Sequence, residues 1–305
     1  MIFDAHCDVL YKLFQQPSLK FTDAEELHIT AKQLKSHQSK VQLFAIFLPP
    51  SLVPGERFKA ALKMIDLFYE RVLAPHPFMK MVKTRNDIEN LLEHEVGAML
   101  TLEGCEAIEG DLLKLTTLLR LGVASVGLTW NWANEVADGA METRGAGLTR
   151  FGEGVIQTIN QYKYWTDVSH LSDRAFWDTI ERAKYPVASH SNSYTICPHP
   201  RNLRDDQVRA IVSKKGCIGM TFVPFFVNNS GQSSITDLIR HIERFCELGA
   251  ANHIGFGSDF DGIDETIPGL SSFKDYDRLI HELHRYYSPA QVNKFLFGNF
   301  INALP

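Results

Sequence analysis

Short runs rich in β-branched and aromatic residues alternate along the chain with longer amphipathic stretches. The intervening stretches have helical spacing: in 54–74, Phe58, Leu62 and Ile65 recur at i, i+4 and i+7 and share one helix face. The apolar runs have the length and composition of strands. They cover residues 2–6, 41–47, 97–104, 123–130, 164–170, 186–191, 216–222 and 253–259.

This alternation predicts an α/β fold of the (β/α)₈ TIM-barrel type. We expect residues 1–305 to form one catalytic domain of this kind. The alternative is a doubly wound open sheet, which normally carries a glycine-rich phosphate turn after its first strand. The stretch "HCDVLYKLF" after the first run has no glycine, so the sequence favours the barrel.

Polar residues with catalytic potential lie where several of the predicted strands end. In such barrels the reacting groups lie at the carboxyl ends of the strands. In a strand, alternate residues share a face, so His6 and Asp8 would point the same way. The candidates are His6, Asp8, Glu103, His170, His190 and Asp259.

Histidine and carboxylate side chains in this arrangement suit Zn²⁺ or a similar ion. Five ligands exceed the usual three of a single catalytic ion but match two ions that share a carboxylate, and Glu103 is the natural bridge. Two such ions, roughly 3.5–4 Å apart, would acidify a shared water and polarise a carbonyl oxygen, which is the chemistry of amide hydrolysis. The predicted ligands are His6, Asp8, Glu103, His170 and His190.

Asp259 would lie at the barrel mouth on the last strand, where a carboxylate can deprotonate the nucleophile and pass the proton to the leaving amine. The alternative is a turn-capping role, since "SDFDG" is also turn-like. Asp167, three residues before His170, should point to the opposite face and is interpreted as structural. Most other histidines, His76 and His241 among them, lie in polar helices or loops and should be solvated.

Composition narrows the function classes. The chain is 45% apolar and 22% charged, with a net charge of −5, which argues against a nucleic-acid partner. No apolar run approaches the roughly 18–20 residues of a membrane span, and charged residues interrupt the N-terminus before a signal peptide can form. Five scattered cysteines without a Cys-x-x-Cys motif are typical of reduced thiols, so we expect a cytoplasmic protein.

The expected partners are a small peptide substrate and a second copy of the chain, because homodimers are the commonest assembly. The apolar stretch "MTFVPFFV" (220–227) fits either a dimer patch or a pocket wall.

Several motifs, in order along essentially the whole chain, resemble the membrane (renal) dipeptidase family of the amidohydrolase superfamily. They are "DAHCD" near the start, "LEG" (102–104), "LTWN" (128–131), "GLT" (147–149), "DVSHLSD" (167–173), "ASHSNS" (188–193), "PRNL" (200–203), "GSDFDG" (257–262) and the terminal "GNF" (298–300). The absence of signal and anchor sequences makes the chain similar to the soluble bacterial members.

The resemblance implies a binuclear zinc dipeptidase that tolerates a D-residue at the carboxyl side; some family members also hydrolyse β-lactams. It implies that His6 and Asp8 bind one zinc, that His170 and His190 bind the other, and that Glu103 bridges them. It also implies that Asp259 is the catalytic Asp. Arg201 matches a position that holds the substrate carboxylate, which suits a planar guanidinium.

One position departs from the family pattern. Mammalian members carry a His after "LT" on the fourth strand, thought to stabilise the tetrahedral intermediate, and this chain has Trp130. Trp donates one N–H and never becomes cationic, so the support of an oxyanion would be weaker or come from Asn131 or Asn134. Trp130 and Trp132 would otherwise be pocket walls or core.

Two other functions remain compatible with the sequence. One is a two-metal amidohydrolase that acts on another amide, a lactam or an ester. The other is a catalytically slack relative that binds peptides, an alternative motivated by Trp130.

Overall fold

The computed structural model describes all of residues 1–305, and nine parallel strands form its sheet. The strands are β1 (Ile2–Asp4), β2 (Ser39–Phe47), β3 (Met79–Met81), β4 (Val96–Glu103), β5 (Val123–Gly127), β6 (Trp165–Asp167), β7 (Pro186–Val187), β8 (Ile218–Met220) and β9 (Ile254–Phe256).

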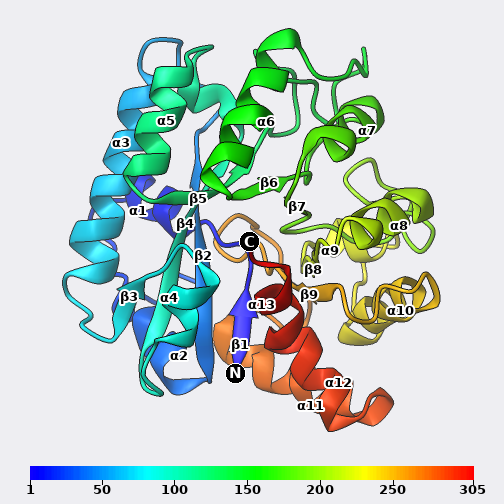
Figure 1. Cartoon of the computed structure of the whole chain (residues 1–305). Coiled ribbons are helices and arrows are strands. Elements are labelled where there is room, and N and C mark those ends of the chain that lie inside the picture. The colour runs from blue at the N-terminus through cyan, green and yellow to red at the C-terminus, as the bar shows by residue number, and fades with distance from the viewer.

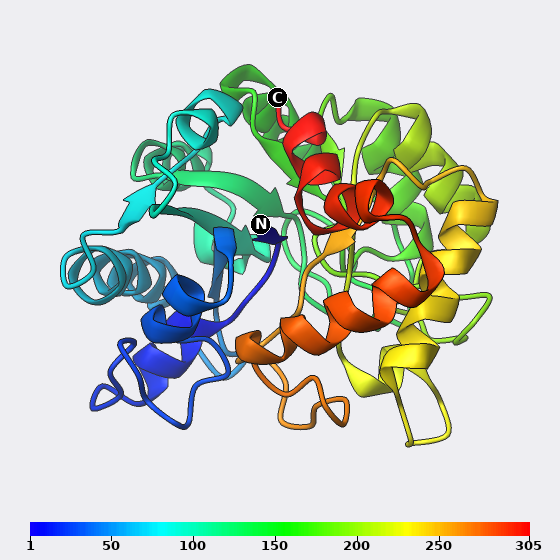
Figure 2. The same cartoon turned by 90° about the horizontal axis from the view of Figure 1, so that it is seen from below.

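Eight of these strands form a barrel in the order β7-β6-β5-β4-β2-β1-β9-β8, and β3 pairs with β4 outside it. A parallel bridge between Ala188 and Ile218 closes the barrel between β7 and β8, where Gly219 N donates to Ala188 O at 2.7 Å. Helices surround this ring of strands (Figures 1 and 2). The predicted (β/α)₈ fold is confirmed, and the open doubly wound sheet is wrong.

The helices lie between and after the strands, and most begin at a side-chain cap such as Thr149, Ser172 or Ser234. They are α1 (Val9–Gln15), α2 (Ala31–Ser36), α3 (Arg57–Leu67), α4 (Arg85–Glu89), α5 (Leu112–Arg120), α6 (Arg150–Tyr162), α7 (Asp173–Arg182), α8 (Asp205–Ser213), α9 (Pro224–Val227), α10 (Ile235–Glu247), α11 (Tyr276–Tyr286), α12 (Pro289–Asn293) and α13 (Asn299–Ala303). Short 3₁₀ or π segments occupy Phe68–Leu73, Cys105–Ile108, Phe273–Asp275 and Lys294–Gly298.

All eight predicted strands are present, but several end earlier than predicted. β1 ends at Asp4, β6 at Asp167 and β9 at Phe256. Beyond β6 and β9 the backbone turns inward: His170 and Asp259 have φ of 68° and 64°, in the left-handed region that ends an extended strand. The candidate side chains therefore lie in turns at the carboxyl edge, just after the strands. The short strand β3 was not predicted.

Two apolar layers hold the barrel together. The larger packs the outer face of the strands against the surrounding helices. The smaller fills the barrel interior at the amino ends of the strands, where α13 closes it. There Phe300 stacks on Phe3 with ring centroids 4.9 Å apart, and Trp165 Nε1 donates to Ala303 O at 2.9 Å. This leaves the carboxyl end as the open mouth.

None of the helices has both the length and the apolar character needed to cross a membrane.

Candidate active site

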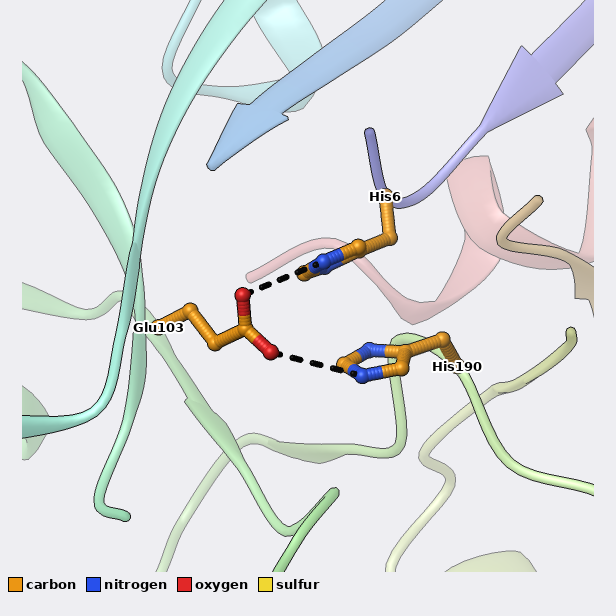
Figure 3. A group of neighbouring side chains, drawn as sticks. All are labelled: His6, Glu103 and His190. Atoms are coloured by element: carbon orange, nitrogen blue, oxygen red, sulfur yellow. Dashed lines mark ion pairs between the residues drawn. The ribbon is translucent and has the colours of Figure 1, made fainter. Parts of the chain in front are cut away.

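Glu103, the last residue of β4, stands at the centre of the polar cluster in the barrel mouth. Its Oε2 lies 3.4 Å from His6 Nε2, and its Oε1 lies 2.9 Å from His170 Nε2 and 3.7 Å from His190 Nε2. Figure 3 shows the carboxylate between the His6 and His190 rings, with one oxygen toward each. All four side chains are buried, so Glu103 connects two half-sites away from bulk water.

The first half-site contains His6 and Asp8, from the segment between β1 and α1. His6 Nε2 lies 3.4 Å from Asp8 Oδ2 and 3.9 Å from Asp259 Oδ1. Gly262 makes room for these carboxylates, since a Cβ there would lie 2.2 Å from Asp8 Oδ2 and 2.7 Å from Asp259 Oδ1. His6 Nε2 and Asp8 Oδ1 are buried and have no hydrogen-bond partner in the protein.

The second half-site contains His170 and His190, whose Nε2 atoms lie 2.8 Å apart. His170 Nδ1 lies 2.9 Å from Asn131 Oδ1, which only accepts hydrogen bonds, so the ring proton is on Nδ1. Ser189 donates its hydroxyl hydrogen to Asp167 and therefore accepts from His190 Nδ1 at 2.7 Å. Both rings thus direct an Nε2 lone pair at Glu103.

The protonation states follow from burial and from the neighbouring charges. Burial alone would lower the pKa of His6, but the carboxylates of Glu103 and Asp8 outweigh it and raise that pKa well above its ordinary value. Burial, followed by the charge of Arg201, lowers the pKa of His170 to about 3. Burial, followed by His6 and His170, also lowers the pKa of His190 well below its usual range. His170 and His190 are therefore neutral imidazoles at neutral pH, the form that ligates metals.

Two of the three carboxyl groups of the cluster, Glu103 and Asp259, have pKa values shifted in opposite directions. Burial opposes ionisation of Glu103, but His6 and His170 outweigh it and lower the Glu103 pKa below its ordinary value. Burial raises the pKa of Asp259 to about 8, against the opposing charge of His6. Asp259 thus lines the mouth with a carboxyl group that can bind and release a proton near neutral pH.

The donor set fits metal cations. In the second half-site, two imidazole lone pairs and a carboxylate oxygen converge with no hydrogen between them, an arrangement that is repulsive unless a positive charge lies there. In the first half-site, the unpartnered His6 Nε2 and Asp8 Oδ1 are buried polar atoms, which normally find a partner. Two groups of side chains have ligand atoms close enough to hold an ion: His6, Glu103 and His190; and His6, Asp8 and Asp259.

A pocket of about 180 Å³ opens directly above the cluster. Besides the polar residues Asp8, Glu103, Asn131, His170 and Asp259, its lining consists of Tyr11, Phe47, Trp130, Val223, Phe226, Gly262 and Ile263. Val223 and Phe226 belong to the apolar stretch 220–227, for which the sequence leaves open a dimer patch or a pocket wall. Both residues line the pocket, as the pocket-wall interpretation predicts.

Arg201, in the segment between β7 and α8, is not among the residues that line this pocket. It is buried, its Nη2 donates to His190 O at 3.2 Å, and its Nε has no partner. Burial lowers its pKa to about 10, so the guanidinium is still cationic at neutral pH. Its Cζ lies 5.5 Å from the centre of the ring of Phe226, a residue that lines the pocket.

The structure also decides among the alternatives around Trp130. Trp130 is partly buried and lines the pocket, whereas the neighbouring Trp132 is 51% exposed and does not. Asn131 bonds to His170. Asn134 is tied to a turn, because its amide donates to Leu128 O at 2.8 Å, so it is not available to support an oxyanion.

Two sequence-based expectations about other residues are wrong. His76 and His241 are buried rather than solvated; His241 Nδ1 accepts from Ser193 N at 3.0 Å, and its Nε2 lies 2.9 Å from Val227 O. Asp167 does not point away from the site, since β6 ends there and strand alternation no longer applies to His170. Ser189 connects Asp167 to His190 through two hydrogen bonds. This connection was not predicted from the sequence, although "DVSH" and "ASHS" place a polar residue beside each histidine.

A (β/α)₈ barrel with histidines and carboxylates converging at its carboxyl mouth defines the class of metal-dependent hydrolases. Comparison with known proteins narrows this class. The chain belongs to the membrane dipeptidase family, peptidase family M19, whose family description matches residues 1–305. It is accordingly a metallo-dipeptidase.

Three similar proteins illustrate the family. An uncharacterized protein encoded in the pqqA 5′ region of Klebsiella pneumoniae is 33% identical in an alignment of 266 positions that covers 83% of this chain and 97% of that protein. The crystal structure of the metallo peptidase "dipeptidase AC" is 26% identical, with a TM-score of 0.91 over 99% of this chain and 97% of that one. A metallo peptidase from Rhodobacter sphaeroides, liganded with a phosphinate mimic of L-Ala-D-Ala, shares the fold at 23% identity, with a TM-score of 0.93 over 99% and 98% of the two chains.

Proposed function

We propose that this metallo-dipeptidase uses two zinc ions to hydrolyse the peptide bond of free dipeptides, including dipeptides with a D-residue at the carboxyl side. His6 and Asp8 would hold one ion, His170 and His190 the other, and Glu103 both. The observation that carries the proposal is the position of Glu103, with one carboxylate oxygen toward each half-site. When bound, the two ions supply Lewis-acid polarisation of the scissile carbonyl and acidification of a water.

The chain's own residues supply proton transfer and orientation. Asp259 would accept the proton of the attacking water and deliver it to the leaving amine, a role that suits its position, since it lines the pocket with its Oδ1 3.9 Å from His6 Nε2. Arg201 would bind the free carboxylate of the dipeptide, because it is a buried cation with an unpartnered Nε–H. Asn131 and Ser189 would orient the His170 and His190 rings.

Two features of the site favour short substrates with a free carboxylate, and they therefore favour a dipeptidase over a general amidase. The pocket of about 180 Å³ has room for a small ligand, and the single guanidinium of Arg201, which lies against the lining residue Phe226, would suit one free carboxylate. The phosphinate mimic of L-Ala-D-Ala on the Rhodobacter sphaeroides protein motivates substrates with a D-residue. Homodimer formation stays a prediction.

The test is amino-acid release from a panel of dipeptides, including L-Ala-D-Ala and L-Leu-L-Leu, by zinc-loaded protein. An N-acetylated dipeptide and a tripeptide are the controls, and metal content is measured on the same sample. We expect cleavage of dipeptides only, with two zinc ions per chain, loss of activity on chelation and its return with zinc. Cleavage of the acetylated compound would indicate a general amidase, and two bound ions without turnover would indicate a peptide-binding relative.

A further inference from the structure

Three aromatic side chains form a continuous surface along one side of the pocket, which we call the aromatic wall: Tyr11, Phe47 and Trp130. The Tyr11 and Phe47 rings meet edge to face with centroids 5.2 Å apart, and Phe47 and Trp130 are tilted at 57°, also 5.2 Å apart. The three come from α1, the end of β2 and the segment after β5. Because each ring packs against the next, the wall presents a fixed apolar face.

The aromatic wall and Arg201 lie on opposite sides of the barrel mouth. In the closed order of strands, β7 lies opposite β2 and β8 lies opposite β4, whereas β5 is separated from β7 only by β6, so Trp130 is the end of the wall nearer Arg201. Arg201 follows β7, and Phe226, over which its guanidinium lies, is in α9 after β8. The Glu103 cluster stands between the two sides.

A dipeptide in this mouth therefore has a defined direction. With its carboxylate at Arg201 and its peptide bond above Glu103, the side chain of its amino-terminal residue reaches the aromatic wall. The wall is mostly ring surface: its polar atoms are the Trp130 indole N–H, which donates to no acceptor within the protein, and the Tyr11 hydroxyl, which accepts from Gln15 Nε2. An apolar side chain would gain burial against this face.

We propose that Trp130 is a specificity-determining residue and that the aromatic wall selects dipeptides with a large apolar or aromatic amino-terminal residue. This inference rests on the proposed function, because it uses the direction set by Arg201. It concerns the position at which this chain departs from the pattern of the mammalian family members, where Trp130 stands in place of a histidine. The aromatic wall would thus define the preferred substrates of the site as dipeptides with a large apolar or aromatic amino-terminal residue.

The experiment compares kcat/KM for L-Phe-L-Ala and L-Leu-L-Ala with that for L-Ala-L-Ala, using zinc-loaded protein, and repeats the three with D-Ala at the carboxyl side. The reversed dipeptide L-Ala-L-Phe controls for general hydrophobicity. We expect the large amino-terminal residue to raise kcat/KM by about tenfold or more over Ala, in the range of apolar pocket discrimination. Equal values for Phe-Ala and Ala-Ala would overturn the proposal, and hydrolysis of no dipeptide at all would instead overturn the proposed function.

Substitutions separate a wall from a catalytic donor. Trp130→Phe keeps an aromatic face but removes the N–H, so the preference for Phe-Ala should persist. Trp130→Ala should reduce the preference to about threefold or less, mainly through a higher KM for Phe-Ala. Trp132→Ala, at the exposed tryptophan two residues away, should leave both values unchanged. An equal fall in kcat for all substrates in both Trp130 variants, with zinc content and circular dichroism unchanged, would contradict the wall and indicate oxyanion support by the indole.

Discussion

At the amino end of the barrel, α13 closes the smaller apolar core: Phe300 stacks on Phe3, and the Trp165 N–H donates to Ala303 O. At the carboxyl mouth, the buried His6 Nε2 and Asp8 Oδ1 have no partner in the protein. The same strands thus carry an apolar end that α13 closes and a polar end where buried histidines and carboxylates converge. Stability should depend mainly on the first end and chemistry on the second.

Backbone conformation does not distinguish the two ends. His170 and Asp259 at the mouth have positive φ, but so do Gln38, Lys163 and Lys215, which precede β2, β6 and β8 at the amino end. The contrast therefore lies in the side chains, apolar in the smaller core and polar in the mouth, and substitutions at the two ends should separate activity from stability.

The largest effect is expected for Asp259→Asn. The amide keeps the shape of the side chain but cannot accept the proton of the water, so kcat should fall by about 10²–10⁴-fold. Stability in urea should be unchanged or higher, since a buried carboxyl is removed, and zinc content should be retained. Asp264→Asn, in the same segment but exposed, is the matched control and should keep its activity. Full activity of the Asp259 variant would rule out its role in proton transfer.

Phe300→Ala tests the closed end. Removing a buried ring should lower the free energy of unfolding by about 3–5 kcal/mol, measured by urea denaturation. The kcat of the folded fraction should stay within about twofold, because Phe300 contacts Phe3 and Trp165 at the end opposite the mouth. A large loss of kcat without loss of stability would mean that the two ends are not separable.

The barrel strands can be predicted from the sequence, but the turns that carry two of the site residues cannot. Strand periodicity gives the eight barrel strands, because each needs a run of buried apolar residues, and it places His6, Glu103, His170, His190 and Asp259 near their carboxyl ends. It overestimates the length of β6 and β9, because the left-handed turns at His170 and Asp259 do not depend on side-chain hydrophobicity. The wrong interpretation of Asp167 follows directly from that error.

Contacts between distant segments could not be predicted in the same way. The aromatic wall joins residues from α1, β2 and the segment after β5, and only the closed barrel brings them together. The role of α13 as the closure of the amino end is equally invisible, since its residues read as an ordinary terminal helix. Local patterns report burial, whereas these features depend on which strands become neighbours.

A smaller effect is expected for Ser189→Ala, which tests the support of the second half-site. Without the hydroxyl, His190 Nδ1 loses its acceptor, and Asp167 no longer orients the ring. Zinc affinity, measured by competition with a chelator, should fall by about 10–100-fold for one of the two proposed ions. Ser191→Ala is the control on the other side of His190, since Ser191 Oγ contacts only Ser169 Oγ, at 3.4 Å. Equal losses in both variants would indicate general disturbance of the segment.

The smallest effect is expected for Trp165→Phe, which removes one hydrogen bond at the closed end and keeps an aromatic ring beside Phe3 and Phe300. The free energy of unfolding should fall by about 1 kcal/mol, with zinc affinity and kcat unchanged. Asn131→Ala removes one hydrogen bond of 2.9 Å at the mouth and should have the opposite effect. Zinc affinity should fall, whereas the free energy of unfolding should change little. Because the two lost bonds are alike in length, the different consequences would come from their positions in the barrel. The same loss of stability and the same zinc affinity in both variants would contradict the division of the barrel into a structural and a chemical end.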